Sequence, residues 1–577
     1  MCGFSGIISK DLDSSEKSLN LMANSIKHRG PDSSKIIKTQ SSNIIFNRLS
    51  IVDLSSEGDQ PMVSKCKNFI IACNGEIYNF KELIKKFNLT GLNINSDVRV
   101  LVELISLLGI EEAFKNIDGM FACYVFDKKN NKHFLVTDFY GQKPLYYAQF
   151  NDSIYFSSEI SSFHEIGKIF HLNINAESDF LRFGHIFGKK TILKNVHRIP
   201  KNTIIELDHL GIKKEKKLIK EKKFRTFNFN EFDNLIKSFI DVDVKFGSFL
   251  SGGFDSTLIS AAASQFKKFD TYTAVFHDFN HNESKIAQQT SKNLGLNHHE
   301  VEISKDNFLD FLYNYPRIFS EPLFDPAVIP IYCLSRSAKI NGSKMILVGD
   351  GGDEIFGGYL DIRKKFNNEF RKIRLLKKTP KFNIPGKFET LLNRISIKFS
   401  LETSSPLDLH YKTSFGDYNS KYISEYHDPF RTEFNEYFQK NDFSFFDNEL
   451  LFSRFLPKLD RPSMAEGIEI RAPFLSDRLI NTKKNRLEKL KLIKKYMDVS
   501  HINTEKKGFA VDTQKLFFNY ASDWIQDQIS FIQRKDKKLF NLLKKDFLLS
   551  KYILRDDKKL IPVLLLIFWK RFWNLYD

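Results

Sequence analysis

The feature of the sequence that most constrains the fold is a glycine-rich turn at Ser251–Ser256, which reads Ser-Gly-Gly-Phe-Asp-Ser. The apolar run before it, Phe246–Leu250, predicts a buried strand, and Thr257–Ala263 predicts a helix directly after it. Adjacent glycines let backbone N–H groups approach a ligand closely, and a helix N-terminus adds partial positive charge. The turn therefore favours a phosphate-binding loop. An ordinary strand–helix turn is the alternative, because the Gly-x-x-x-x-Gly-Lys-Ser/Thr pattern of common nucleotide triphosphatases does not occur.

Strands and helices alternate after this turn, and the alternation predicts a parallel sheet with ligands at the C-terminal ends of its strands. The expected strands are Thr271–Phe276, His299–Ile303 and Lys344–Val348, and the expected helices lie near 283–294, 306–318 and 329–339. A second glycine-rich loop, Gly349–Tyr359, follows the last strand and carries three carboxylates. Because Mg²⁺ prefers carboxylate oxygens, Asp255 and Asp353 are its candidate ligands, with an exposed acidic turn as the alternative.

Residues 1–165 show short strand patterns and two helical patterns, which predict antiparallel sheets mixed with helices. The expected strands are Gly3–Ile8, Ile44–Ile51, Asn68–Cys73, Ala122–Asp127, His133–Thr137, Leu145–Tyr147 and Ser153–Ser157, and the expected helices are Lys81–Phe87 and Ser96–Leu108. Cys2 is the notable side chain of this segment. Removal of Met1 would place its thiol beside a free α-amino group, whose pKa of about 7.7–8.0 suits a base for that thiol.

Four polar or glycine-bearing clusters follow one another at the ends of apolar strands: His28–Asp32, Arg48–Val52, Asn74–Asn79 and Asp118–Phe121. Together with Cys2, they make residues 1 to about 165 resemble the class II, N-terminal-nucleophile glutamine amidotransferase domain. The sequence departs from that family at Asn47, where a histidine is usual, and at Thr137, where an arginine is common.

This resemblance implies that Cys2 attacks the side-chain amide of glutamine, while the Asn74 side chain and the Gly75 N–H form an oxyanion hole. Arg48 would hold the α-carboxylate, since a guanidinium suits a carboxylate, and Asp97 would hold the α-amino group. The implied glutamine-binding residues are Arg48, Leu49, Ser50, Ile51, Val52, Asn74, Gly75, Glu76 and Asp97. Considered alone, Asn74-Gly75 favours a hairpin turn, and Arg48 and Asp97 are typical of surface ion pairs.

The two glycine-rich loops together resemble the pyrophosphatase-type ATP-binding family, which splits ATP between its α and β phosphates. This second resemblance covers residues 235–577, and it implies that ATP is a substrate used with Mg²⁺ on Asp255 and Asp353. The implied ATP-binding residues are Leu250, Ser251, Gly252, Gly253, Asp255, Ser256, Val275, Val348 and Gly349. Asp350, where some members have glutamate, and Glu354 are candidates for proton handling during attack by ammonia.

Two motifs lie further along the chain. In Lys506-Lys507-Gly508-Phe509, Lys506 matches a family lysine that contacts the phosphates in the transition state, and Lys507 is expected at the surface. The charged run Lys458–Leu475 starts a helix, and a structural network of salt bridges is its alternative explanation. Ser476 then replaces an aspartate that is usual in the family.

A glutaminase domain followed by an ATP-loop domain is similar to the glutamine-dependent asparagine synthetase family. The similarity implies glutamine hydrolysis at Cys2, internal transfer of ammonia, adenylation of aspartate, and amidation to asparagine with release of AMP and pyrophosphate. A related amidotransferase that acts on another carboxylate, for example a sugar acid in surface-polysaccharide biosynthesis, is the alternative that the sequence leaves open.

The expected fold is an α+β N-terminal domain with two antiparallel sheets between helices, followed by an α/β domain with a parallel, adenine-nucleotide-hydrolase-like sheet that further helices extend. We expect the glutaminase domain at 2–190, a linking segment at 191–234 and the synthetase domain at 235–577. The segment 363–450, rich in Lys, Phe and Asn, matches no pattern with a known role.

The net charge of +17 raises a different class of function, a non-enzymatic protein that binds nucleic acid. The lysines are spread along the chain, and the run Lys213–Lys223 mixes lysine with glutamate, so a solvated basic surface is expected instead. The five cysteines include no Cys-x-x-Cys pair, and the N-terminus shows no secretion signal. A cytoplasmic enzyme of small-molecule substrates, without nucleic-acid or membrane partners and possibly homodimeric, is the expectation. The apolar run Leu560–Trp569 is expected to be a buried helix, because it is too short to span a bilayer.

Overall fold

The structure is a computed structural model of the whole chain. The residues that it describes are 2–12, 15–89, 95–166, 171–218, 229–276, 284–356, 448–480, 486–498, 513–535, 537, 540 and 560–575.

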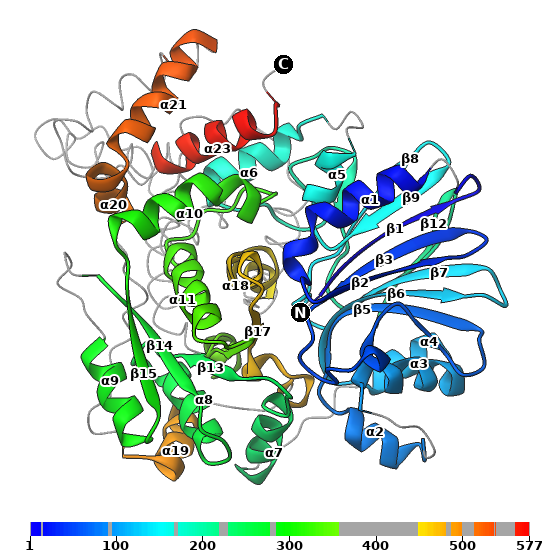
Figure 1. Ribbon diagram of the computed structural model, residues 1–577, viewed down its shortest axis with the longest axis horizontal. Coiled ribbons are helices and arrows are strands. Elements are labelled where there is room, and N and C mark those ends of the chain that lie inside the picture. The colour runs from blue at the N-terminus through cyan, green and yellow to red at the C-terminus, as the bar shows by residue number, and fades with distance from the viewer. Residues whose placement is uncertain are drawn as a thin grey trace, which may run out of the picture.

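The N-terminal half contains two six-stranded antiparallel sheets that lie face to face (Figure 1). In spatial order, the first sheet contains β10 (Val196–Arg198), β8 (Tyr146–Phe150), β9 (Ser153–Ser157), β1 (Gly3–Ser9), β3 (Ser42–Arg48) and β2 (Ser33–Lys38). The second contains β12 (Gly211–Lys217), β11 (Thr203–Asp208), β7 (Lys132–Thr137), β6 (Gly119–Asp127), β5 (Phe69–Ile77) and β4 (Met62–Val63). Side chains of both sheets interdigitate between them, with the rings of Tyr124 and Phe156 stacked at 4.8 Å.

Helices cover the outer faces of the two sheets. They are α1 (Glu16–Ser25) and α5 (Ser161–Glu165) on the first sheet, and α2 (Phe80–Lys86), α3 (Asp97–Leu108) and α4 (Ile110–Asn116) on the second. Helix α3 begins at a Ser96 cap and turns an apolar face of Val98, Leu101 and Ile105 towards β5. The expected arrangement of two antiparallel sheets between helices is therefore confirmed.

The C-terminal half is built on a five-stranded parallel sheet, as the alternation of strands and helices predicts. Its strands are, in spatial order, β15 (Asn297–Glu302), β14 (Asp270–Val275), β13 (Phe246–Phe249), β16 (Met345–Leu347) and β17 (Glu469–Arg471). Apolar side chains from α7 (Phe229–Phe239), α8 (Phe254–Ser264) and α19 (Arg486–Tyr496) pack on one face. Those of α10 (Lys305–Ile318), α11 (Val328–Ile340) and α18 (Leu456–Ala465) pack on the other.

Five further helices complete the described part of this half: α9 (Ser284–Asn293), α12 (Gly352–Phe356), α20 (Thr513–Tyr520), α21 (Ser522–Lys535) and α23 (Leu560–Phe572). Helix α23 is buried along most of its length, which confirms the expectation for Leu560–Trp569, and it packs near α6 (Ile174–Phe183) of the N-terminal half. Within the described residues, no helix combines the length and the apolar character needed to cross a membrane.

The structure changes one sequence-based expectation, excludes one alternative, and shows strands within the segment expected to link the domains. The strand expected at Ile44–Ile51 ends at Arg48, because the next residues leave the sheet to pass the Cys2 thiol. Asn74-Gly75 is not a hairpin turn, since both residues lie inside β5 and pair with β6. The segment 191–234, expected to link the domains, contributes three strands to the N-terminal sheets, β10, β11 and β12.

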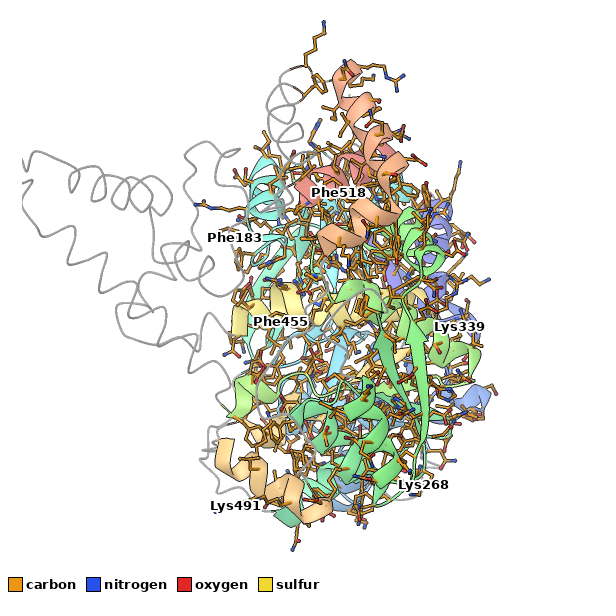
Figure 2. All side chains as sticks on the ribbon, turned by 90° about the vertical axis from the view of Figure 1, so that its left-hand side faces the viewer. Phe183, Lys268, Lys339, Phe455, Lys491 and Phe518 are labelled. Carbon is orange, nitrogen blue, oxygen red and sulfur yellow. The ribbon has the colours of Figure 1, made fainter. Side chains whose placement is uncertain are left out.

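The basic residues are spread over the molecule, as the sequence suggests. Lys268, Lys339 and Lys491 are exposed and lie far apart in the side view of Figure 2. The lysines of β12 are likewise exposed; Lys216 pairs with Glu111, and Glu215 of the same strand pairs with Lys189. This described part of the surface fits a solvated basic face.

Candidate active sites

Cys2 lies immediately before β1 and is 7% exposed. Its Sγ accepts a hydrogen bond from the Leu49 N–H over 3.4 Å and lies 3.7 Å from the Leu49 carbonyl oxygen, to which the thiol can donate. Burial raises the pKa of the Cys2 thiol, although the positive N-terminus opposes this effect. The resting thiol is therefore protonated at neutral pH, and it needs a base before it can act as a nucleophile.

Asn74 and Gly75 stand beside Cys2 in the middle of β5. The Cys2 backbone N–H donates to Asn74 Oδ1 over 3.1 Å, whereas Asn74 Nδ2 is buried and has no hydrogen-bond partner among the described residues. A side chain at position 75 would collide with the Met120 carbonyl oxygen of β6, so only glycine fits there. An unpaired buried donor next to a thiol is the arrangement that an oxyanion hole requires.

The other expected glutamine-binding residues surround this point. Arg48 is 6% exposed and donates to the Ser55 carbonyl over 2.7 Å and to Asp59 over 2.9 Å. Leu49 and Ile51 are buried, and Ser50 and Val52 are partly exposed. These backbone and carboxylate contacts hold the Arg48 guanidinium in one orientation.

Two carboxylates complete the first site. Asp97, at the start of α3, accepts a hydrogen bond from the Ile77 N–H over 2.8 Å, and burial raises its pKa to about 6. Glu76, two residues after Asn74, is 5% exposed. Burial and the nearby Asp97 raise the pKa of Glu76, and Arg471 opposes that shift. Asn74 and Glu76 project from the same face of β5, because alternate residues of a strand share a face.

The second site begins at the turn between β13 and α8, where the sequence predicts a phosphate loop. The Ser251 N–H donates to Ser256 Oγ over 3.2 Å, and the two hydroxyls lie 3.1 Å apart. These bonds close the turn with Gly252 and Gly253 at its tip, and α8 starts at the next residue. Leu250 and Val275 are buried at the C-terminal ends of β13 and β14, where a parallel sheet binds ligands.

The two glycine-rich loops touch each other. A side chain at Gly349 would collide with the Asp255 backbone, and one at Gly352 would collide with Asp255 Oδ1. Val348, just before this second loop, is buried and donates its N–H to the Arg471 carbonyl over 3.0 Å. The expectation that both loops form one site is supported by these contacts.

The acidic residues of the second loop lie on or just before α12. Asp350, Asp353 and Glu354 are each partly exposed, and the Lys458 ammonium lies 3.8 Å from Asp350 Oδ1. The Asp255 carboxylate forms an ion pair with Lys489 of α19. Lys506, the lysine expected to contact the phosphates, lies outside the described residues.

Lys489 is a residue that sequence analysis missed. Helix α19 belongs to a lysine-rich stretch in which Lys491, Lys494 and Lys495 are chemically equivalent to it. Only the fold shows that Lys489 is nearly buried, at 8% exposure, and faces the loop. The pattern of charges along the helix gave no signal for it.

The carboxylates of the second site suit Mg²⁺. Gly352 lies so close to the Asp255 carboxylate that a Cβ at position 352 would fill the space beside it. Asp353 follows on the same loop. Among the described residues, no group of three or more His, Cys, Asp or Glu is gathered as for a metal held by protein alone. One or two carboxylates are what Mg²⁺ uses when substrate phosphates and water complete its coordination.

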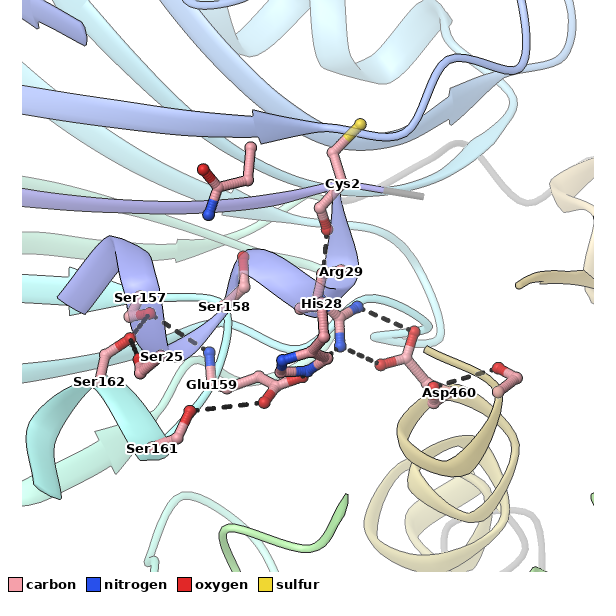
Figure 3. Close-up of polar contacts among 12 residues, drawn as sticks. Cys2, Ser25, His28, Arg29, Ser157, Ser158, Glu159, Ser161, Ser162 and Asp460 are labelled. Atoms are coloured by element: carbon pink, nitrogen blue, oxygen red, sulfur yellow. Dashed lines mark hydrogen bonds and ion pairs between the residues drawn. The ribbon is translucent and has the colours of Figure 1, made fainter. Parts of the chain in front are cut away.

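Buried charges connect the two halves. Arg29, which is fully buried, donates to the Cys2 carbonyl over 3.2 Å, to Glu159 over 2.7 Å and to Asp460 of α18 over 2.9 Å (Figure 3). Interactions with His28 and Arg29 hold the pKa of Glu159 at about 2 despite its burial. The backbone of Cys2 is thereby held, through its carbonyl oxygen, by a network of buried charges that reaches the C-terminal half.

The charged run Lys458–Leu475 and the residue after it make further buried polar contacts. Arg461 donates to Glu321 over 3.1 Å and to the Tyr146 hydroxyl over 2.7 Å. Ser476, which replaces the usual aspartate, donates to Asp118 over 3.0 Å. The alternative explanation of Lys458–Leu475 as a network of structural salt bridges is therefore confirmed for Arg461 and Asp460.

Comparison with known proteins agrees with this two-site arrangement. A model of the glutamine amidotransferase domain matches residues 1–218, and a model of asparagine synthase matches residues 231–571. The chain belongs to the asparagine synthase family. One relative within it is asparagine synthetase [glutamine-hydrolyzing] 1 of Bacillus subtilis, which is 27% identical over 99% of this chain and 96% of its own length.

A second relative is the putative asparagine synthetase [glutamine-hydrolyzing] 2 of Methanocaldococcus jannaschii, 32% identical over 66% of this chain and 79% of its own. Among solved structures, glutamine phosphoribosylpyrophosphate amidotransferase of B. subtilis covers 52% of this chain and 65% of its own at 15% identity. Its TM-score of 0.30 is too low to bear on function. Membership of the asparagine synthase family therefore rests on the sequence matches.

Proposed function

We propose that this chain is a glutamine-dependent asparagine synthetase with two active sites. Glutamine is hydrolysed in the N-terminal half, and the ammonia passes inside the protein to the C-terminal half. There ATP adenylates the β-carboxylate of aspartate, and ammonia displaces AMP to give asparagine. Adenylation is needed because a carboxylate reacts with ammonia only after one of its oxygens becomes a good leaving group.

At the first site, the thiol of Cys2 adds to the side-chain amide of glutamine and releases ammonia, which leaves a thioester that water hydrolyses to glutamate. The α-amino group exposed by removal of Met1 takes the thiol proton, since burial keeps the thiol protonated at rest. Asn74 Nδ2 and the Gly75 N–H stabilise the oxyanion. Arg48 holds the α-carboxylate of glutamine, and Asp97 receives its α-amino group.

At the second site, the turn of Ser251–Ser256 holds the departing pyrophosphate. Asp255 and Asp353 would hold Mg²⁺, which when bound neutralises phosphate charge. Lys489 and Lys506 add positive charge from two later segments, and the turn itself needs no lysine. Asp350 and Glu354 are the groups available to take a proton from the attacking ammonia.

One observation carries this proposal: beside Cys2, Asn74 has a buried amide nitrogen with no hydrogen-bond partner among the described residues, in a chain whose other half brings two glycine–acid loops together. A non-enzymatic basic protein has no use for either arrangement. The test is a coupled assay on the purified protein. We expect pyrophosphate release that depends on aspartate, ATP and a nitrogen source, and its absence would refute the assignment.

Cys2→Ala separates the two halves of the reaction. We expect this variant to lose glutamine-dependent synthesis and to keep synthesis from free ammonia. The acceptor is tested separately by ATP–pyrophosphate exchange with aspartate and with sugar acids. Exchange supported by a sugar acid and not by aspartate would keep the chemistry but change the substrate.

We also propose that the boundary between the two domains lies within the predicted linking segment, between the end of β12 at Lys217 and the start of α7 at Phe229. The five cysteines of the chain are all free, which supports a reducing, cytoplasmic location. Glutamine, aspartate and ATP are the proposed small-molecule substrates, and homodimer formation remains a proposal that gel filtration with light scattering would test.

A further inference from the structure

Arg471 is a fully buried arginine at the end of β17, in the C-terminal half. Its guanidinium donates to Glu76 over 2.7 Å, to Glu469 over 2.6 Å and to the Phe239 carbonyl over 2.9 Å. Glu76 lies 395 positions earlier in the sequence, in the glutaminase half. A residue of the synthetase half thus makes a charged hydrogen bond inside the glutamine site.

Glu76 is placed to contact glutamine. It shares one face of β5 with Asn74, whose amide lies against Cys2. Asp97, held by the N–H of the residue that follows Glu76, is the second carboxylate at this point. Two carboxylates so close suit the ammonium group of an amino acid, provided that both stay ionised.

Ionisation of Glu76 depends on its neighbours. Burial and the negative charges of Asp97 and Glu469 raise its pKa, whereas Arg471 and the chain N-terminus oppose that rise. Arg471 is the arginine that touches its carboxylate directly. Without that contact, an ionised Glu76 would be a buried charge without its cation, and it would take up a proton or turn away from the site.

Arg471 also reaches the second site through its backbone. It pairs with Leu347 in the parallel sheet, and its carbonyl accepts the N–H of Val348, one residue before the Gly349 loop. The same residue therefore borders the ATP loop with its main chain and the glutamine site with its side chain.

We propose that Arg471 is a positioning residue for glutamine: the synthetase half supplies this guanidinium to hold the Glu76 carboxylate where it binds the α-amino group of the substrate. The inference rests on the proposed glutamine site at Cys2. It makes glutamine binding depend on residues of the synthetase half, and in particular on the strand that borders the ATP loop.

The test measures glutamate release from glutamine by the full-length chain, together with ammonia-dependent pyrophosphate release. Arg471→Met should raise KM for glutamine about tenfold or more, the expected scale for losing a charged hydrogen bond, with a smaller change in kcat. Synthesis from ammonia should stay within about twofold of the parent chain, because the main chain of β17 is unchanged. Arg471→Lys, which restores a charge but not the fork of donors, should recover part of the glutamine affinity.

A double-mutant cycle distinguishes positioning from general support of the fold. If Arg471 acts through Glu76, then in a Glu76→Gln background Arg471→Met should raise KM for glutamine by less than about threefold. Arg478→Met is the matched control, since Arg478 also joins the two halves, over 2.9 Å to Asp118, and makes no contact with Glu76 in the described structure. It should leave KM for glutamine unchanged.

Three results would overturn the inference. The first is additive effects on KM in the cycle, and the second is a loss of ammonia-dependent synthesis in Arg471→Met and Arg471→Lys as large as their loss of glutamine hydrolysis. The third is a KM for glutamine no higher in Arg471→Met than in Arg478→Met. If Arg471→Met does not fold, Arg471→Lys and Glu76→Gln still complete a cycle of their own. Glutamate release needs no acceptor, so the test stands even if the acceptor is not aspartate. A parent chain that releases no glutamate would instead refute the proposed glutamine site.

Discussion

The backbone N–H of Cys2 donates to the side-chain oxygen of Asn74 over 3.1 Å, and the amide nitrogen of Asn74 is buried with no partner in the described part of the chain. An orphaned donor of this kind costs stability in the resting protein. It is satisfied when a tetrahedral oxyanion forms at the carbon that Cys2 attacks. The residue that orients the nucleophile's backbone is thus also the donor that the reaction needs.

Asn74→Asp tests this relationship, because it keeps the acceptor oxygen for Cys2 and replaces the donor by a second oxygen. We expect kcat for glutamine hydrolysis to fall about 10²–10³-fold, the usual effect of removing one oxyanion donor. Ammonia-dependent synthesis serves as the internal control and should persist. Steady-state assays of glutamate release give the comparison, and an unchanged kcat would show that Asn74 has no role in the reaction.

Asp97 gives the glutamine site a pH dependence. Burial raises its pKa to about 6, and its titration is shared with the nearby Glu76. If ionised Asp97 binds the α-amino group, KM for glutamine should rise as pH falls through about 6, approaching about tenfold per pH unit below it. Asp97→Asn should have a high KM that varies little over the same range.

The raised pKa of Asp97 also makes the stability of the fold depend on pH. The folded chain holds a proton on Asp97 that the unfolded chain releases near pH 4, so this group stabilises the fold at low pH, and its contribution is lost as pH rises through about 6. Asp97→Asn should therefore not be less stable than the parent chain at pH 7. Thermal melting at pH 5 and pH 7 measures this, and a large loss of stability at pH 7 would contradict it.

Lys489→Met should weaken the synthetase site alone. The substitution leaves the Asp255 carboxylate without its ammonium partner, and loss of a charged hydrogen bond of about 1.5–3 kcal/mol corresponds to a roughly 10–100-fold decrease in rate. Lys491→Met is the matched control, since Lys491 is exposed on the same helix. Pyrophosphate release should fall in the first variant only. Equal glutamate release in both would confirm that the other site is intact.

Arg29→Met should reduce stability more than a surface substitution does. It leaves the buried carboxylates of Glu159 and Asp460 without their shared cation, a change that typically costs about 3–5 kcal/mol. The exposed pair of Lys38 and Glu16 offers the control, because Lys38→Met should change stability by no more than about 1 kcal/mol. Differential scanning fluorimetry of the three chains would show equal melting midpoints if the buried network contributed nothing.

Much of the fold and of both sites could be predicted from the sequence, because their signals are local. The turn at Ser251 is predicted from a few adjacent residues, and the alternation of strands and helices predicts the parallel sheet, whereas the roles of Cys2 and Asn74-Gly75 follow from several motifs that occur in order along the chain. The contact of Gly349 with the Asp255 backbone follows the same logic, since neighbouring parallel strands end at one edge.

What could not be predicted depends on partners far away in the chain. Arg471 meets Glu76 only when β17 reaches the edge of its sheet, and nothing in the adjacent residues marks that meeting. Likewise, Lys489 is one of several lysines on its helix, and burial alone distinguishes it. The end of β3 at Arg48 was predicted too late because Leu49 is apolar and continues the strand pattern, whereas its backbone serves the Cys2 thiol.

The bond between Arg29 and Asp460 spans 431 positions of the chain, which has a consequence during protein synthesis. A ribosome adds about 5–20 residues per second, so about 20–90 seconds pass between the synthesis of Arg29 and that of Asp460. Until Asp460 is made, Glu159 is the one of these two carboxylates that can hold Arg29, and the arginine that contacts the Cys2 carbonyl lacks its second ion pair. A nascent chain would then hydrolyse glutamine poorly, and ammonia would not be released before the half that consumes it has been made.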